Sequence, residues 1–339
     1  MATKAVEAPV FKTGAEKKIV FLNTFKQTGV SQANVNTLAA FTFGKVIEEQ
    51  KVTKVADIKN LTEQDTLYKI IQAAFIAGIQ EVVIKGVLMD AGSTNYKEFF
   101  DSVSNEYFGV LTDVTEVAKL KLISKEVASR EKMFFATLAK DVEVTGATME
   151  TLGEIAEDGT SITLSTNEDT VHGSVAGYAI AKFPGSTLIA NKLINGATDS
   201  GLNGAEQGIA DKANCNYMAR MKGQLGLANG VTVTGDPIDY IHCLKALKFR
   251  LEEDMTLWLK ATQKPDFYDL APLKQRIAKR TAQFGTMGAI ADERTSITFI
   301  PLNEIPENDI LNGVLSGVKI TVYYRFGIKE IAADLYFAV

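Results

Sequence analysis

The two ends of the chain carry the alternation of apolar and polar residues that is typical of β-strands. Residues 317–326 alternate, a second apolar-rich piece covers 331–339, and a shorter strand pattern covers 18–23. A period of two indicates strands with one buried face. Strand-forming arms at both ends predict a protein that joins copies of itself by strand exchange. The residues expected to make these pairings are Ile19, Phe21, Val318, Ile320, Val322, Tyr324, Phe326, Leu335 and Phe337.

Between residues 64 and 182 the hydrophobic period alternates between that of a helix and that of a strand. The predicted helices are 64–77, 95–105, 114–131, 147–157 and 170–182, and the predicted strands are 80–85, 107–112, 133–139 and 161–165. Short strands that alternate with longer helices predict a parallel sheet covered by helices. The preceding stretch, 32–60, is mixed and has no clear period.

The pattern changes after residue 186. Residues 196–208 are a loop by composition, because glycine and small polar residues dominate them. A helix-and-strand segment, 211–234, leads to the Asp236-Pro237 pair, and proline suits the first turn of the long helix that runs to Leu259. A helix at 271–282 and a strand at 296–300 complete this region.

We therefore expect an α/β fold, α+β overall, in which a helix-covered α/β domain is followed by an assembly domain with strand-exchanging N- and C-terminal arms. The expected parts are an N-terminal arm and strand (1–25), the α/β domain (26–195), the assembly domain (196–316) and the C-terminal strand arm (317–339).

Composition excludes several classes of partner. The chain has 339 residues and a net charge of −5, which argues against nucleic acid as the main partner, since that requires a basic face. No apolar run approaches the roughly 18 residues that span a bilayer. The first ten residues lack the apolar core of a signal peptide, so we expect synthesis in a cytoplasm. Cys215 and Cys243 are expected to be free thiols.

No motif in the chain points to catalysis, a cofactor or a metal ion. The loops after the predicted strands contain neither a dinucleotide-binding glycine motif nor a phosphate loop. Asp90, Asp113 and Asp169 lie where helix caps belong, so we expect them to cap helices. His172 and His242 are expected to be structural, because neither has the neighbours of a catalytic or metal site.

One basic cluster stands out on the predicted helix 271–282. It consists of Lys274, Arg276, Lys279 and Arg280. It is either a solvated helix face or a self-contact with an acidic stretch such as 252–254 of another copy.

The order of several motifs resembles the contractile-tail sheath proteins of contractile phage tails and related bacteriocin and injection machines. The motifs are the helix-Gly-strand passage 73–84, the small-residue helix and Pro-Gly passage 173–185, the Asn-rich segment 212–217, the long helix opened by Gly235-Asp-Pro-Ile-Asp, and the closing strand arm. Each is weak alone, and together they cover most of the chain.

The resemblance implies a non-enzymatic subunit that polymerises as stacked rings around an inner tube and contracts to drive the tube through a target cell envelope. The implied partners are other copies of itself, the inner tail tube protein, and the baseplate and tail terminator proteins, with no nucleic acid and no membrane. The implied location is a virion tail assembled in the host bacterial cytoplasm. Gly313 and Gly317 would be hinges, and the basic cluster would contact the tube or ring.

Two alternatives to a sheath subunit stay open. One is an enzyme with a doubly wound α/β domain, which a perturbed carboxylate near Asp90 or Asp113 would favour. The other is a different self-assembling tail or capsid component, whose tube forms tend to be smaller and richer in β-strand.

Overall fold

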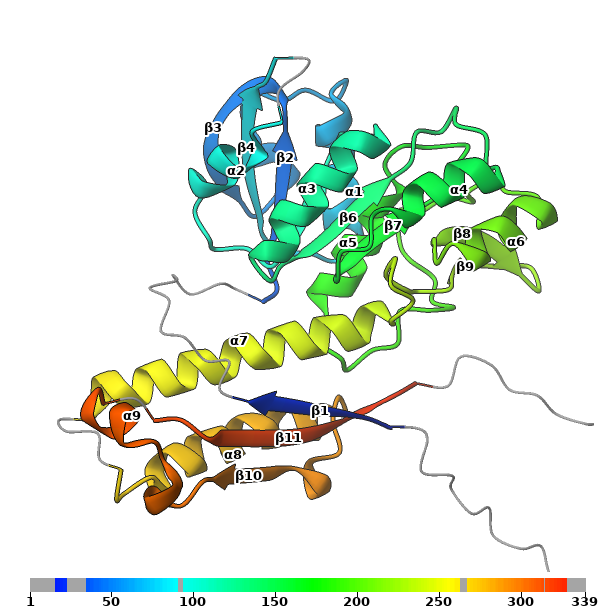
Figure 1. The fold of residues 1–339 in the computed structure, drawn as a ribbon. Helices are drawn as coiled ribbons and strands as arrows, with labels where there is room; N and C mark the ends of the chain where they lie inside the picture. Colours follow the sequence, from blue (N-terminus) through cyan, green and yellow to red (C-terminus); the bar gives the residue numbers. More distant parts are fainter. Residues whose placement is uncertain (1–15, 23–34, 91–93, 263–266, 314, 328–339) are drawn as a thin grey trace, which may run out of the picture.

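The long helix α7 (Ile238–Ala261) passes between two lobes in the computed structural model (Figure 1). The structure describes residues 16–22, 35–90, 94–262, 267–313 and 315–327. One lobe holds a six-stranded sheet with helices on both faces, and the other holds a three-stranded sheet backed by α8 (Ala271–Thr286). The mixed architecture confirms the expected fold class, α/β and α+β overall.

The six-stranded sheet is parallel except for one edge strand. In spatial order its strands are β3 (Gly44–Val52), β4 (Val82–Leu88), β2 (Leu38–Thr42), β5 (Gly109–Thr112), β6 (Met133–Thr137) and β7 (Thr160–Thr163). Only β3 runs antiparallel to its neighbour, β4. The chain moves from β2 to one side and then to the other, which makes the gap between β2 and β5 a topological switch point.

Helices cover both faces because successive strand residues point to opposite sides. Leu38 and Ala40 of β2 join one hydrophobic cluster, and Ala39 and Phe41 join the other. The first cluster is covered by α1 (Thr66–Ala77) and α5 (Val171–Ala181). The second is covered by α2 (Tyr96–Asp101), α3 (Val117–Ser129) and α4 (Gly146–Gly153). All five helices lie within the helical ranges expected from the sequence, apart from Gly146 at the start of α4.

Two strands, β2 and β3, were not predicted because neither shows the alternation of a half-buried strand. Every residue of β2 is buried, as in a strand covered on both faces, so its sequence is apolar up to its last residue, Thr42. The edge strand β3 is mostly exposed, and its register with β4 shifts at two places.

The expected loop at 196–208 is wrong in its last part, where α6 (Gly204–Lys212) begins. The Asn203 side chain accepts hydrogen bonds from the backbone N–H groups of Ala205 and Glu206, and the Glu206 side chain accepts one from the backbone N–H of Asn203. This reciprocal cap stabilises a helix start that the glycine content obscures. A two-stranded hairpin follows, β8 (Tyr217–Met221) and β9 (Gln224–Ala228).

The second lobe combines segments from both ends of the chain. Its elements are β1 (Glu16–Leu22), α8, β10 (Ser296–Phe299), α9 (Glu307–Leu311) and β11 (Val318–Arg325). Short 3₁₀ turns lie at Val55–Asp57, Asp292–Arg294 and Leu302–Glu304. The expected long helix, the helix after it, and the strands expected at 18–23 and 317–326 are present, whereas the apolar piece 331–339 lies outside the described residues. Within the described ranges, none of the helices combines the length and apolar composition that crossing a bilayer requires.

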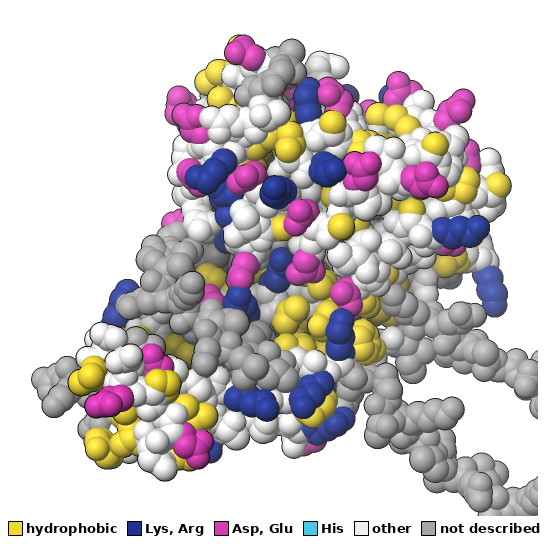
Figure 2. Space-filling model, in the orientation of Figure 1, with side chains coloured by type: hydrophobic (Ala, Val, Ile, Leu, Met, Phe, Trp, Pro, Cys, Tyr) yellow, Lys and Arg dark blue, Asp and Glu magenta, His cyan; other side chains and the backbone are white. Residues whose placement is uncertain are grey.

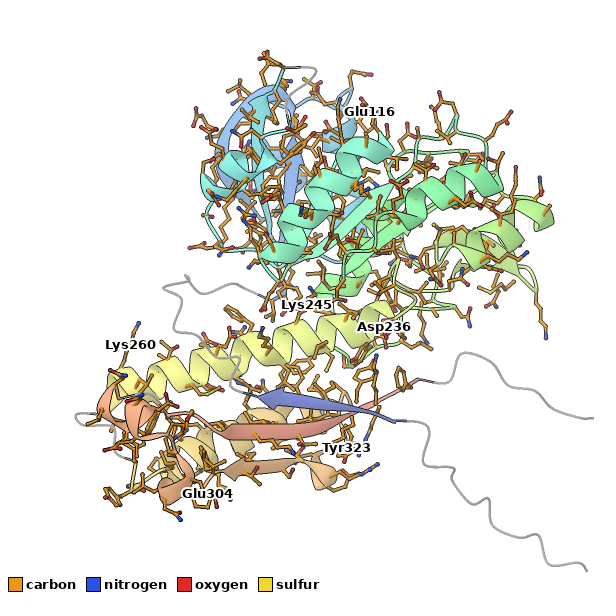
Figure 3. The ribbon with its side chains drawn as sticks, in the orientation of Figure 1. Glu116, Asp236, Lys245, Lys260, Glu304 and Tyr323 are labelled. Atoms are coloured by element: carbon orange, nitrogen blue, oxygen red, sulfur yellow. The ribbon has the colours of Figure 1, made fainter. Side chains whose placement is uncertain are left out.

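One hydrophobic cluster connects the two lobes. It contains Val175 of α5, Ile241 and Leu247 of α7, and Ile320 of β11. At the margin of this contact Lys245 of α7 points toward the six-stranded lobe, where its ammonium lies 3.5 Å from Asp158 (Figure 3). Apolar burial therefore holds the lobes together through α7.

Helix α5 lies in the middle of this cluster, and all of it except Tyr178 and Ala181 is buried. It approaches the backbone of α1 very closely. A Cβ added at Gly173 would lie 2.4 Å from the carbonyl oxygen of Ile70, and one added at Gly177 would lie 2.4 Å from that of Ala74. These two positions therefore have no room for a side chain.

Gly177→Ala should lower the unfolding free energy by roughly 1–3 kcal/mol, because the added methyl group overpacks the contact between α1 and α5. The matched control is Gly208→Ala on α6, where an added Cβ meets no atom within 4 Å; it should be neutral or stabilising by about 0.5–1 kcal/mol. Urea denaturation of both variants checks this. Equal stability of the two variants would contradict the close helix packing.

Candidate assembly surface

The three-stranded sheet is the candidate surface for assembly, and β11 is its central strand. Both β1 and β10 pair with β11 in antiparallel orientation. The register places Ile19 opposite Val322, and Ile297 opposite Ile320. Residues 289–291 extend the β10 side, since the N–H of Arg325 donates to the carbonyl of Ala289 at 3.1 Å. Both edges of β11 are therefore paired within the chain.

The inner face of β11 is packed against α7 and α8. Val318, Ile320, Val322 and Tyr324 are at most 5% exposed. The Tyr324 hydroxyl donates a short hydrogen bond to the buried carboxylate of Asp239 on α7. Burial raises the pKa of Tyr324, and the neighbouring carboxylate raises it further, so the phenol stays protonated as the donor.

The outer face of the sheet is polar and positively charged. Lys18, Lys319 and Arg325 are exposed on it, and dark blue side chains line this part of the lobe (Figure 2). The Arg294 guanidinium lies 3.9 Å from the centre of the Tyr323 ring, an arrangement suited to a cation–π contact. This face is bounded by β1 and β10, whose outer edges have no strand partner among the described residues. An unpaired strand edge is a template for pairing with another chain.

Among the described groups of β1, the contacts to the rest of the molecule come from its backbone and from the side chains of Lys17 and Ile19. The backbone of β1 pairs with β11, and the side chain of Ile19 is buried in the hydrophobic cluster that the sheet covers. The Lys17 ammonium donates to the Asp236 carboxylate at 2.8 Å and lies 4.2 Å from the centre of the Tyr240 ring. Asp236 lies just before the N-terminal end of α7 (Figure 3). The contacts described for β1 are thus one strand ladder, the buried side chain of Ile19, and the ion pair and ring contact of Lys17.

The structure brings most of the predicted pairing residues to this sheet, but buries them within one chain. Ile19, Val318, Ile320, Val322 and Tyr324 belong to its core, and Phe326 packs 5.2 Å from Tyr324, ring centre to ring centre. The backbone of Phe21 pairs with Ile320. Leu335 and Phe337 lie outside the described residues. Exchange between copies therefore stays a prediction for all of these residues.

The two predicted hinge glycines lie in the connection before β11. Gly313 and Gly317 have φ angles of 66° and 75°, a region that glycine adopts readily. A Cβ at Gly317 would also lie 2.4 Å from the Ile300 side chain. Both glycines thus fit a turn, and their role as hinges stays a prediction.

The predicted basic cluster lies on α8 and divides into two parts. Lys274, Arg276 and Lys279 are exposed and form no ion pair with any described residue. Arg280 instead donates to both carboxylate oxygens of Asp254, at 2.7 and 3.0 Å. The acidic stretch expected to meet this cluster from another copy thus binds Arg280 within the same chain.

Both histidines are buried and hydrogen-bonded. Nε2 of His172 donates to the carbonyl of Thr112 at 3.0 Å, so Nδ1 accepts from the Thr137 hydroxyl at 2.7 Å. Nε2 of His242 donates to the carbonyl of Val35 at 3.3 Å. Burial lowers the pKa of each histidine to about 4. Both therefore stay neutral at pH 7.

Carboxylates and thiols in the described part of the chain do not form a metal site. Asp113, at the switch point between β2 and β5, accepts a hydrogen bond from the Thr42 hydroxyl at 2.8 Å rather than capping a helix. Burial raises its pKa. Asp169 accepts from the N–H of Lys140 at 2.7 Å, and Asp90 is exposed. Cys215 and Cys243 are free and buried.

Comparison with known structures identifies the fold. A chain of the baseplate of the anti-feeding prophage aligns with 100% of this chain and 100% of its own length, at a TM-score of 0.69 and 10% identity. A chain of the contracted helical sheath of the anti-feeding prophage aligns with 100% of this chain and 99% of its own length, at a TM-score of 0.65 and 11% identity. A sheath tail protein from Desulfitobacterium hafniense aligns with 79% of this chain and 91% of its own length, at a TM-score of 0.55 and 8% identity.

The protein therefore has the fold of contractile-tail sheath proteins, over its full length. Neither a family model nor a curated protein sequence matches the chain. The resemblance inferred from the order of weak motifs is confirmed at the level of the fold.

Sequence reasoning missed the residues that fasten β1 and β11 to α7. Asp236 and Asp239 follow Gly235 in a motif that signalled a helix start, and nothing local in the sequence indicated that Lys17 and Tyr324 would meet them. These contacts join residues far apart along the chain.

Lowering the pH from 7.5 to 4.5 should destabilise the protein. A histidine in the unfolded chain binds a proton below about pH 6.5, whereas each buried histidine binds one only near pH 4. Protonation therefore stabilises the unfolded state relative to the folded state by up to about 3 kcal/mol per histidine as the pH falls. The variant His242→Gln retains a hydrogen-bond donor for the carbonyl of Val35. Between these pH values its free energy of unfolding should fall by roughly 2–3 kcal/mol less than that of wild type. Urea denaturation at both pH values measures this.

The exposed substitution Lys69→Gln should retain the pH dependence of wild type. An identical pH dependence in His242→Gln would show that His242 is not the buried neutral group described above.

Proposed function

We propose that the chain is the structural subunit of a contractile tail sheath, which polymerises as stacked rings around an inner tube and contracts to drive the tube through a target cell envelope. The observation that carries this proposal is the full-length likeness to a chain of one contractile particle in its contracted sheath, together with a chain of that particle's baseplate. We infer that the protein acts through assembly and not as an enzyme, which the structural roles of these neighbours support.

The arrangement of β1 supports strand exchange between copies. Its ladder with β11, the burial of Ile19 and the Lys17–Asp236 pair can all form equally well with a neighbouring copy, as in domain swapping. The segment 23–34 connects β1 to the six-stranded lobe and spans roughly 40 Å when extended at about 3.3 Å per residue. Exchange of β1 would link copies without changing the fold of either lobe.

In this proposal the strand-pairing ends are 1–25 and 317–339, and the bodies between them are 26–195 and 196–316. Leu335 and Phe337 of the C-terminal segment would pair with a neighbour, and Gly313 and Gly317 would let the bodies turn relative to β11. The assembled extended lattice would be metastable, and contraction would repack the bodies into a second arrangement. The partners would be the inner tube, baseplate and terminator proteins of a tail assembled in a bacterial cytoplasm.

Cysteines introduced at Lys18 and Tyr323 test the exchange of β1, since these residues lie opposite each other in β1 and β11. Oxidation of assembled tubes should link successive copies into a covalent ladder on a non-reducing gel, because the two cysteines then belong to different chains. The native cysteines are buried and should not interfere.

The matched control is a cysteine pair at Thr298 and Lys319, which lie opposite each other in β10 and β11. This pair should give only internally bridged single copies. If the Lys18–Tyr323 pair also gives only single copies in assembled tubes, β1 is not exchanged. If the full chain forms neither rings nor tubes with or without an inner tube protein, the sheath function itself is wrong.

The exposed part of the basic cluster should contact the inner tube. Changing Lys274, Arg276 and Lys279 together to Glu should weaken co-sedimentation with a purified tube protein by at least about tenfold near 0.15 M salt, because three surface charges are reversed at an electrostatic contact. Reversing the exposed Lys69, Lys125 and Lys212 to Glu is the control with the same change in net charge. Equal binding by both triple variants would exclude α8 as the tube contact.

A further inference from the structure

A surface groove lies between the segment 191–193 and the β8–β9 hairpin. It encloses about 640 Å³ and is lined by Asn191, Leu193, Met221, Gln224, Leu225 and Gly226. Leu193 is 64% exposed and Met221 is 37% exposed, although both are large apolar side chains. Their exposure side by side in one groove is typical of a binding surface.

The groove also offers backbone hydrogen-bonding groups. Asn191 and Lys192 pair with Leu227 of β9, through bonds of 2.8 and 3.1 Å. Because strand orientation repeats every second residue, the N–H and C=O groups of Leu225 point outward as those of Leu227 do. In the described part of the chain, no backbone group outside the hairpin pairs with Leu225. The groove therefore combines three apolar side chains, those of Leu193, Met221 and Leu225, with a short strand edge, which together suit an extended peptide.

The end of the described chain lies against Leu188, a short distance along the chain from the groove residue Asn191. A Cβ added at Gly327 would lie 3.1 Å from the Cβ of Leu188. Leu188 precedes Asn191 by three positions, which is at most about 11 Å of chain. The segment 328–339, extended at about 3.3 Å per residue, spans roughly 40 Å and reaches the whole groove from this point.

The sequence of the segment 328–339 fits the groove in pattern and in charge. Its apolar residues on one strand face are Ile331, Ala333, Leu335, Phe337 and Val339. It carries two acidic residues, Glu330 and Asp334, against one basic residue, Lys329. The groove is bordered by three exposed basic residues, Lys192, Lys222 and Arg220, the last of which lies 4.0 Å from the Asp199 carboxylate. Opposite charge at the rim favours binding of this segment over a basic one.

We propose that residues 328–339 of the free subunit dock in the groove of their own chain, as a strand added to the Leu225 edge of β9. The docking goes beyond the proposed function and does not require it. Its consequence rests on that function: a docked segment is withheld from neighbouring copies, so the free subunit is restrained from polymerising until the segment is released.

Limited trypsin digestion of the full chain tests the docking, because Lys329 is the cleavage site inside the segment. Intact-mass spectrometry follows the loss of residues 330–339. In the free subunit, Leu193→Asp should speed this cleavage by at least about tenfold, since protection is lost when the segment detaches. Leu335→Asp should give a similar increase from the opposite side of the contact.

The matched control is Leu311→Asp on α9. The replaced leucine is 76% exposed and lies in the second lobe, away from the β8–β9 hairpin that borders the groove (Figure 1). Its cleavage rate should equal that of wild type. Equal rates in wild type, Leu193→Asp and Leu335→Asp would overturn the proposal. So would protection that disappears on dilution, because the segment would then be held by a second copy. Neither result depends on the β1 exchange, which the Lys18–Tyr323 cysteine pair measures separately.

Discussion

The burial of β11 fixes the arrangement of the whole second lobe. Its inward side chains lie in the same hydrophobic cluster as α5 and α7, and each fully buried side chain of this kind contributes about 1.5–3 kcal/mol. The Tyr324–Asp239 hydrogen bond adds a polar constraint, because either group alone would be costly to bury. Both edges of β11 are also paired, so within a single chain it is the central strand on which the sheet is built.

β11 is the central strand of its sheet and β1 is an edge strand, so removing one or the other would expose different parts of the lobe. Moving β11 would expose the core of the molecule, whereas moving β1 breaks one ladder, uncovers Ile19 and parts Lys17 from Asp236. In a swapped pair the same contacts form again in the neighbouring copy, so little enthalpy separates the closed and exchanged forms. Concentration and local geometry then decide between them. A lattice held in this way can change shape while its links persist.

The sequence predicted the fold better than it predicted the partners of the candidate surface. The βα alternation and the terminal strands were visible because their periods are local. The strand β2 was hidden by burial on both faces, and α6 by glycines that its reciprocal cap outweighs. For β11 the period of two indicated correctly that one face is covered. The period of two does not indicate whether the residues packed against that face belong to the same chain or to another copy. Arg280 illustrates the same limit, since its acidic partner was recognised but lies on α7 of the same chain.

The six-stranded lobe has the topology in which many α/β proteins bind ligands, yet its switch point is closed by its own side chains. Thr42 at the end of β2 donates to Asp113 after β5, and His172 connects Thr112 with Thr137 across neighbouring strands. These groups satisfy one another and cross-link the carboxyl edge of the sheet. The raised pKa of Asp113 follows from this burial and needs no catalytic role. Under the proposed sheath function, such an edge would stiffen the six-stranded lobe so that it could move as one body.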